Sequence, residues 1–346
     1  MKNYNDPENM FDAIWNFSKN IEDASGIGEN ISLKNQYKNI DHIIISGMGG
    51  SAIGGDLVSI LESKTLSIPL TVLRGYSIPL WISKNTLVIC SSYSGNTEET
   101  LSVLDQAQRE NLKICGITTG GRLEQRLREM GKDVVIIPKG LQPRAAIAYS
   151  FIPMIALLEK IEVLSSDFWK KIPDLLKLLK EKRQLYSKGT NDNPVFKLSK
   201  LIKNRIPVIY SDSSTMGIAA NRLKGQLAEN SKMLSWNNEL PELNHNEIVG
   251  WENNANLFSN LYVIWLKDID DHERVKLRME ISSKILKNLK IDQAELFMDG
   301  NSFQERFLHM IHYGDWLSFW CAIMHNTDPS PVEKIHFLKQ ELSVKL

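Results

Sequence analysis

The chain has 346 residues, of which 42% are hydrophobic and 24% are charged, and this composition excludes a disordered chain and is sufficient for two domains with their own cores. Lys plus Arg and Asp plus Glu both number 41, so there is no overall basic field for nucleic acid or an anionic membrane. No apolar run approaches membrane-spanning length, and the N-terminal residues do not fit a signal peptide. We therefore expect a cytoplasmic protein without nucleic-acid or membrane partners, in which any anion site is local.

Strand and helix patterns alternate along the whole chain. In the first half we expect a helix over 10–19, a strand beginning at 42, a helix over 52–61, strands over 69–73 and 86–91, a helix over 97–111, a strand over 113–118, a helix over 122–130, a strand over 133–137 and helices over 145–161 and 167–186. In the second half we expect a strand over 205–210, a helix from 216, a strand over 260–266, a helix over 273–288, a strand over 290–296 and a helix over 303–325.

This alternation predicts an α/β fold with two domains, each a mainly parallel sheet flanked by helices in a doubly wound, flavodoxin-like arrangement. The polar stretch 187–194 marks the boundary, so the predicted domains are 1–186 and 187–346. Ligands of such sheets bind at the carboxyl ends of the strands, and a cleft between domains is a preferred place for a small-molecule site.

A glycine-rich segment, 47–55, follows the first strand and begins the next helix. Gly49 and Gly50 let backbone amides approach a ligand closely, and Ser51 adds a hydroxyl at the helix N-terminus. These features favour a phosphate site. A tight turn that only packs helix on strand would also explain some of the glycines.

The same segment also fits a loose dinucleotide fingerprint, Gly47-x-Gly49-x-x-Ala52. A nicotinamide site would need an acidic residue after the second strand to hold a ribose hydroxyl, whereas this strand ends in Arg74. An arginine could accept a 2′-phosphate, so an NADP-dependent oxidoreductase remains an alternative.

A second loop rich in hydroxyl groups follows the strand 86–91. Ser92, Ser94 and Thr97 surround Gly95 in this loop, immediately before a predicted helix. Thr97 could serve only as a helix N-cap, but three hydroxyls are more than one cap uses. Two such loops at strand ends favour a pocket for a phosphomonoester, and a dinucleotide enzyme has no evident use for the second loop.

The two loops, with three shorter motifs, resemble the sugar isomerase (SIS) domain family and, within it, the bifunctional phosphoglucose/phosphomannose isomerases. The shorter motifs are Pro143-Arg144, Glu229-Asn-Ser-Lys232 and Asn244-His-Asn-Glu247, and the resemblance covers nearly the whole chain. It implies two SIS-type domains, a phosphorylated hexose as substrate and a homodimer. The implied reaction is reversible aldose–ketose isomerisation of glucose 6-phosphate and mannose 6-phosphate to fructose 6-phosphate, through a cis-enediolate and with no metal or other cofactor.

Glu229 lies near the end of the helix that begins at 216, where the negative end of the helix dipole would make its carboxylate a stronger base. A surface glutamate at a helix end would have no such role, but the resemblance implies that Glu229 moves a proton between C1 and C2. Arg144 follows the fifth strand and could stabilise a developing enediolate or pair with an acid at a helix start. Its position after a strand end favours the first role.

His245 lies in a polar loop, and a histidine suits the proton transfer that opens a cyclic sugar. Lone histidines are often structural, but the resemblance implies that His245 opens the ring in the site of the neighbouring subunit. It also implies that Lys334 assists and that Thr327 makes space for the mannose epimer. A non-catalytic SIS regulator that binds a sugar phosphate is the alternative function, and it would need the hydroxyl loops but neither Glu229 nor His245.

Glu305, His309 and His312 fall on one face of the last long helix and could in principle hold zinc or iron. Trp316 and Trp320 follow on the same helix, which indicates that this side packs in a core or against another subunit. We therefore predict that these three residues pack and that the protein has no metal site.

Overall fold

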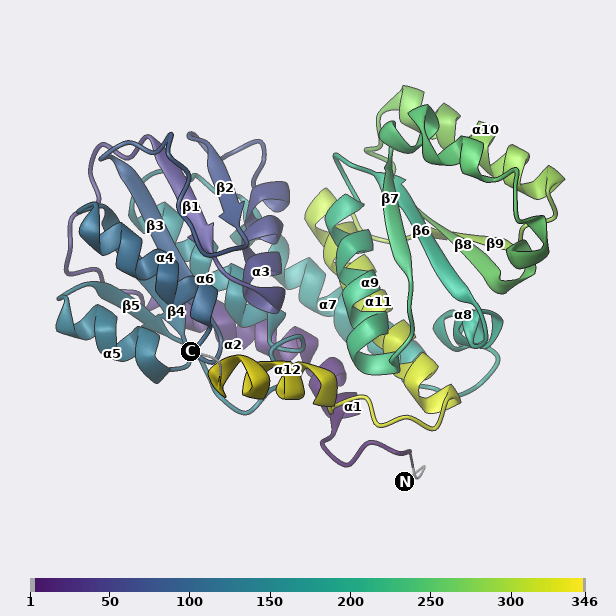
Figure 1. Cartoon of the computed structure of the whole chain (residues 1–346), viewed down its shortest axis with the longest axis horizontal. Helices are drawn as coiled ribbons and strands as arrows, with labels where there is room; N and C mark the ends of the chain where they lie inside the picture. Colours follow the sequence, from purple (N-terminus) through teal and green to yellow (C-terminus); the bar gives the residue numbers. More distant parts are fainter. Residues whose placement is uncertain (1–3, 345–346) are drawn as a thin grey trace. The chain divides into compact units, whose positions relative to one another are not determined.

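The computed structural model describes residues 4–344, which form two α/β units (Figure 1). One unit comprises residues 16–177, and the other comprises residues 4–15 together with 178–344. Each unit contains a parallel sheet flanked by helices, which confirms the predicted fold class. Within the described range no helix has the length and apolar character needed to span a membrane.

The first unit contains a five-stranded sheet in the order β2-β1-β3-β4-β5, which is the flavodoxin-like order. Its strands are β1 (His42–Ser46), β2 (Leu70–Leu73), β3 (Thr86–Ser92), β4 (Lys113–Thr118) and β5 (Asp133–Ile136). Its helices are α2 (Phe17–Glu29), α3 (Gly49–Leu61), α4 (Glu98–Arg109), α5 (Gly121–Glu129), α6 (Ile147–Lys160) and the first part of α7 (Phe168–Tyr186).

Side chains alternate across this sheet, so each face has its own helix layer. Ile44 and Val88 pack against α4 and α5. Ile45 points to the other face, where it lies close to Gly55 of α3. The helix α6 is buried along nearly its whole length and packs against α2 and α3, because it is apolar on all sides.

The second unit contains a four-stranded sheet in the order β7-β6-β8-β9. Its strands are β6 (Ile206–Asp212), β7 (Trp236–Leu240), β8 (Leu261–Lys267) and β9 (Gln293–Phe297). Its helices are α1 (Met10–Trp15), the end of α7, α8 (Pro194–Ile202), α9 (Gly217–Ser231), α10 (Glu273–Asn288), α11 (Phe303–Met324) and α12 (Glu333–Val344), with 3-10 helices η1 (Glu242–His245), η2 (Glu247–Gly250) and η3 (Ala255–Asn260). The buried helix α11 packs against α8 and α9 and forms the centre of this unit.

The division between the units differs from the predicted boundary at 186/187. It falls inside α7, between residues 177 and 178, and residues 4–15 belong to the second unit. The contacts of Arg183 explain this, because its guanidinium lies 4.5 Å from the centre of the Trp15 ring and donates a hydrogen bond of 3.0 Å to the Trp15 carbonyl. The end of α7 and the N-terminal segment therefore pack together.

The sequence predicted every described strand except β7. Its sequence, Trp-Asn-Asn-Glu-Leu, has no apolar alternation, because β7 is an edge strand whose residues are mostly only half-buried. The predicted helix over 10–19 is two helices that meet at Asn16. The helices α8 and α12 were not predicted.

Candidate active site

The two predicted loops meet at the carboxyl ends of β1 and β3. These strands are adjacent and parallel, and Ser46 at the end of β1 is paired with Cys90 of β3. Strand order reverses here, since β2 lies on one side of β1 and β3 to β5 lie on the other. Sheets of this kind bind ligands at such a switch point, so both loops lie where the fold favours a site.

Close packing against neighbouring residues explains why some positions of the glycine-rich segment 47–55 are glycine. A Cβ atom at Gly50 would lie 2.8 Å from the Pro143 carbonyl oxygen, and one at Gly54 would lie 2.6 Å from Ser150 Cβ. Gly49 is different, because it has φ +49° and a Cβ atom there would have no neighbour within 4 Å. The first amides of a helix have no partner carbonyl in a preceding helical turn. The amides of Gly49 and Gly50, at the start of α3, can therefore bind an anion. Gly54 is therefore explained by packing, whereas the backbone at Gly49 has open space beside it that a ligand could occupy.

The second loop contains one buried and one exposed serine. The Ser92 hydroxyl is buried, lies 2.8 Å from the Thr97 hydroxyl and accepts a 3.1 Å hydrogen bond from the Gly95 amide. Thr97 occupies the N-cap of α4, but its hydroxyl binds Ser92 and does not cap the helix, contrary to the capping role considered from the sequence. Ser94 is exposed, and its hydroxyl accepts a 3.2 Å hydrogen bond from the Asn96 amide.

Tyr93 connects three segments of this site and was not singled out from the sequence. Its amide donates a 3.2 Å hydrogen bond to the hydroxyl of Ser51, which is itself buried. Its own hydroxyl accepts a 3.1 Å hydrogen bond from the amide of Leu141, three residues before Arg144. The bond between one loop's amide and the other loop's hydroxyl depends on the fold, and no sequence pattern reveals it.

Arg144 lies behind the first loop. Its side chain is buried, and its Cα atom lies 3.8 Å from the position that a Cβ atom at Gly50 would occupy. The structure thus brings the Gly49–Ser51 loop, the Ser92–Thr97 loop and Arg144 together in one unit. By contrast, Arg74 forms an ion pair with Asp56 of α3, so its guanidinium already has an acidic partner within the unit.

Glu229 is half-buried and lies on the last turn of α9, as predicted. The residues after it fasten this end of the helix to α11. The Asn230 side chain donates a 2.9 Å hydrogen bond to the Ser318 hydroxyl, and the Ser231 hydroxyl donates a 2.6 Å hydrogen bond to the Ser318 carbonyl. Because these partners are buried, the backbone that carries Glu229 is held in one place.

The loop that contains Thr327 lies beside the end of α9 that carries Glu229. The Lys232 ammonium donates to the carbonyls of Glu229 at 2.8 Å and of Asp328 at 2.9 Å. Thr327 precedes Asp328 and is half-buried, and its amide donates to the Ala322 carbonyl at 2.9 Å. Lys334 is exposed at the start of α12, six residues after Asp328.

His245 lies elsewhere in the unit. It is exposed at the end of η1, which packs through Leu243 into a core cluster with Tyr210 and Trp265. Neighbouring residues hold the segment, since Asn244 donates a 2.9 Å hydrogen bond to the Ser282 hydroxyl of α10. The loop is therefore ordered while the imidazole faces outward.

Glu229 and His245 lie on opposite faces of the four-stranded sheet. The cluster with Trp265 also contains residues of α10, so η1 and α10 share one face. Leu266 is the next residue of β8 and points to the other face, where it lines a small cavity together with Leu223 of α9. The structure therefore brings Glu229 to the Thr327 loop and leaves His245 on the far side of the sheet.

The face with Glu305, His309 and His312 is buried, which confirms the predicted packing. The Glu305 carboxylate accepts from the Ser302 hydroxyl at 2.8 Å and from the Asn301 amide at 3.0 Å, both at the start of α11. The ring nitrogens of His309 lie 2.7 Å from the Tyr186 hydroxyl and 3.0 Å from the Asp299 carbonyl, and Trp316 donates to His312 Nε2 at 3.1 Å. Within residues 4–344, no group of three or more His, Cys, Asp or Glu side chains is arranged to hold a metal ion.

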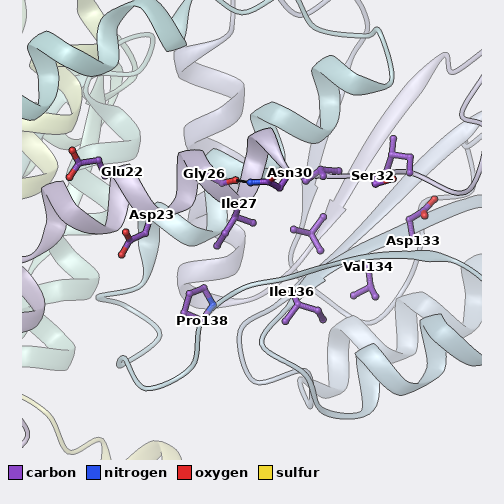
Figure 2. Close-up of a pocket in the computed structure, with 13 residues that line it drawn as sticks. Glu22, Asp23, Gly26, Ile27, Asn30, Ser32, Asp133, Val134, Ile136 and Pro138 are labelled. Atoms are coloured by element: carbon purple, nitrogen blue, oxygen red, sulfur yellow. Dashed lines mark hydrogen bonds between the residues drawn. The ribbon is translucent and has the colours of Figure 1, made fainter.

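A cavity of about 730 Å³ lies in the first unit, between the second half of α2 and the edge strand β5 (Figure 2). Glu22 and Asp23 lie at one end of it, and Val134 and Ile136 of β5 line another side. The predicted site residues are not among those that line it. We place the candidate site at the β1 and β3 loops instead, because helix amides and hydroxyls meet there at a switch point.

Known proteins were found to resemble this chain in sequence and in fold. Residues 191–342 match the family model described as bacterial phospho-glucose isomerase C-terminal SIS domain. A hypothetical protein from Thermus thermophilus has a similar solved structure, with a TM-score of 0.73 and 13% identity over 97% of this chain and 90% of that one.

Two curated relatives are called bifunctional phosphoglucose/phosphomannose isomerase. The protein from Caldicellulosiruptor bescii is 39% identical over 96% of this chain and 99% of its own length. The protein from Aquifex aeolicus is 36% identical over 87% of this chain and 90% of its own length. At this identity and coverage, the chain belongs to the family of bifunctional phosphoglucose/phosphomannose isomerases.

Proposed function

We propose that this protein is an enzyme that reversibly isomerises glucose 6-phosphate and mannose 6-phosphate to fructose 6-phosphate. The observation that carries the proposal is the pair of loops at the β1/β3 switch point, joined by the hydrogen bond from the Tyr93 amide to the Ser51 hydroxyl. Helix amides and hydroxyls on two adjacent strand ends suit a phosphomonoester. The names of the relatives supply the hexose.

In the proposed mechanism the loops hold the 6-phosphate and the reaction takes place at the other end of the opened sugar. Glu229 removes the proton from C2, a cis-enediolate forms, and the proton returns to C1. Arg144 stabilises the negative charge that develops on the oxygen atoms. Rotation about the C2–C3 bond of the intermediate would let one base serve both epimers, and no step requires a metal ion because side chains carry the protons.

We further propose that the active form is a homodimer in which His245 opens the ring in the site of the neighbouring subunit, with help from Lys334. The separation of Glu229 and His245 by the second sheet supports this, because two groups acting on one sugar must both reach it. A second copy related by two-fold symmetry would present its own exposed His245.

A coupled assay with fructose 6-phosphate, scoring glucose 6-phosphate and mannose 6-phosphate separately, tests the proposal. We expect both products from the purified protein, and we expect the rate to survive exhaustive dialysis against a chelator. Binding of fructose 6-phosphate with no turnover would show a sugar-phosphate regulator instead. Activity that disappears on chelation and returns with one metal would contradict the proposed mechanism while leaving the reaction in place.

A further inference from the structure

Lys232 follows α9 in a backbone conformation that most residues avoid. It forms the C-cap of the helix with φ +56° and ψ +30°, in the left-handed region. Glycine commonly takes such a position, because a side chain there is strained. At Lys232 the side chain makes contacts that a glycine could not make.

The Lys232 side chain turns back toward the protein. Its ammonium group donates hydrogen bonds to four main-chain carbonyls: Glu229 at 2.8 Å, Asp328 at 2.9 Å, Pro329 at 3.2 Å and Asn230 at 3.4 Å. An ammonium group has three N–H donors, so the longer contacts share a donor. Two of these carbonyls belong to the last turn of α9 and two belong to the loop that precedes α12.

This loop has internal hydrogen bonds that maintain its shape. The Thr327 amide donates to the Ala322 carbonyl at 2.9 Å, and the Ser330 amide donates to the Asp328 carboxylate at 3.0 Å. Thr327 is next to Asp328, and α12 with Lys334 begins soon after Ser330, which is buried. The Lys232 ammonium thus joins the backbone of the proposed base to the segment that carries Thr327 and leads to Lys334.

We propose that Lys232 is a positioning residue that sets the proposed base, Glu229, against the Thr327 loop and so governs both the rate of proton transfer and the ratio of the two epimers. This inference rests on the proposed function. It assigns the lysine no contact with the sugar. A small displacement between base and substrate is enough to slow a proton transfer strongly, whereas the phosphate loops lie on other elements and are unaffected.

The test compares Lys232→Met, Lys232→Arg and Lys232→Gly with a matched control, Lys290→Met. Methionine keeps the length of the side chain and removes its charge, and arginine retains a cation with several donors. Lys290 follows α10 in the same left-handed conformation, with φ +60°, so its variant reports the effect of removing such a lysine by itself. Glycine relaxes the backbone at 232 and keeps the test valid if the methionine variant does not fold.

With fructose 6-phosphate, we expect Lys232→Met to lower kcat by about tenfold to a hundredfold and to leave KM within about threefold. The ratio of mannose 6-phosphate to glucose 6-phosphate should change in the same variant. Lys232→Gly should show the same loss, Lys232→Arg should recover most of kcat, and Lys290→Met should match the parent.

Lys232→Met or Lys232→Gly with the parental kcat and product ratio would overturn the inference, even if thermal stability fell, because the lysine would then be only a helix cap. A parent protein that converts fructose 6-phosphate to neither product would instead refute the proposed function. The two failures are therefore distinguishable in one experiment.

Discussion

Ser92 and Ser94 are two positions apart in the same loop, yet their hydroxyls have different surroundings. Ser92 is buried and bonded to Thr97 and to the Gly95 amide, so it maintains the shape of the loop. Ser94 is exposed and bonded only locally, to the Asn96 amide, so its hydroxyl can turn toward a ligand. The two serines should therefore respond differently to the loss of their hydroxyls.

Ser92→Ala should destabilise the fold by about 1–3 kcal/mol, because it leaves buried polar partners without a hydrogen bond. Ser94→Ala should keep the stability of the parent and weaken binding of glucose 6-phosphate by roughly tenfold to a hundredfold, the value of one hydrogen bond to a charged group. Thermal unfolding and titration calorimetry on both variants measure the two effects. Unchanged affinity in Ser94→Ala would remove Ser94 from the proposed phosphate site.

Glu229→Gln should abolish isomerisation of both epimers and leave sugar-phosphate binding nearly intact, because the amide retains the shape but cannot accept the C2 proton. Exchange of the C2 hydrogen with deuterated water provides an independent measurement. If the variant exchanges this hydrogen at the parental rate, another residue is the base and the assignment of Glu229 must be withdrawn.

At the scale of elements, the two sheets carry different groups at corresponding strand ends. β6 and β8 are adjacent like β1 and β3, but acidic side chains lie at their carboxyl ends and are bonded to the protein itself. Asp212 accepts from the Ser214 amide at 2.8 Å, and Asp271 accepts from the Asp268 amide at 2.8 Å and from the Thr215 hydroxyl. These carboxylates would repel a phosphate, which explains why only the first sheet is assigned an anion site.

Asp271 makes the stability of this element depend on pH. Burial, together with the charges of Asp212 and Asp268, raises the pKa of Asp271 from 3.8 to about 6. The folded state therefore binds a proton more tightly than the unfolded state, so this contribution to stability is present at low pH and is lost as pH rises from about 4 to about 6. The whole loss is about 3 kcal/mol.

Asp271→Asn should remove this contribution, since an asparagine can still accept from the Asp268 amide and donate to Thr215. We expect its unfolding free energy, relative to the parent, to rise between about pH 4 and about pH 7. Denaturant unfolding at several pH values measures the difference. Parallel pH profiles for the two proteins would show that the Asp271 carboxyl does not titrate in this range.

At the scale of the whole molecule, the proposed site needs two chains. Glu229 and His245 lie on opposite faces of one sheet, and His245 is exposed on an ordered loop. If His245 acts on the sugar held by a second copy, one chain can supply the histidine that the other lacks. If it acts within its own chain, no mixture of defective chains can form an intact site.

Coexpression of Glu229→Gln and His245→Ala should therefore restore isomerisation of glucose 6-phosphate. About a quarter of the parental rate is expected, because half of randomly assembled dimers are mixed and one of their two sites has both side chains. Each variant assembled alone is the control and should remain close to inactive. A mixture no more active than the controls would place His245 in the site of its own subunit or outside the reaction.

The sequence by itself determined the fold class, the family and the strand ends that carry the proposed site. Apolar strands that alternate with helices favour a parallel sheet in each unit. The glycines and the serine of the Gly49–Ser51 loop indicate an anion site without any knowledge of what packs around them. The position of Glu229 at a helix end was predictable for the same reason, because helix periodicity is a local property. Edge strand β7 was missed, since packing rather than an alternating pattern forms it.

Only the tertiary structure decided which candidates lie together. The hydrogen bond from Tyr93 to Ser51, the contact of Gly50 with the Pro143 carbonyl and the carbonyls gathered by Lys232 all join segments far apart in the chain. The same is true of the sheet that separates Glu229 from His245. Such contacts depend on how whole helices and strands pack. The residues that flank each partner in the sequence do not indicate which distant residue it will contact, so no local pattern encodes these contacts.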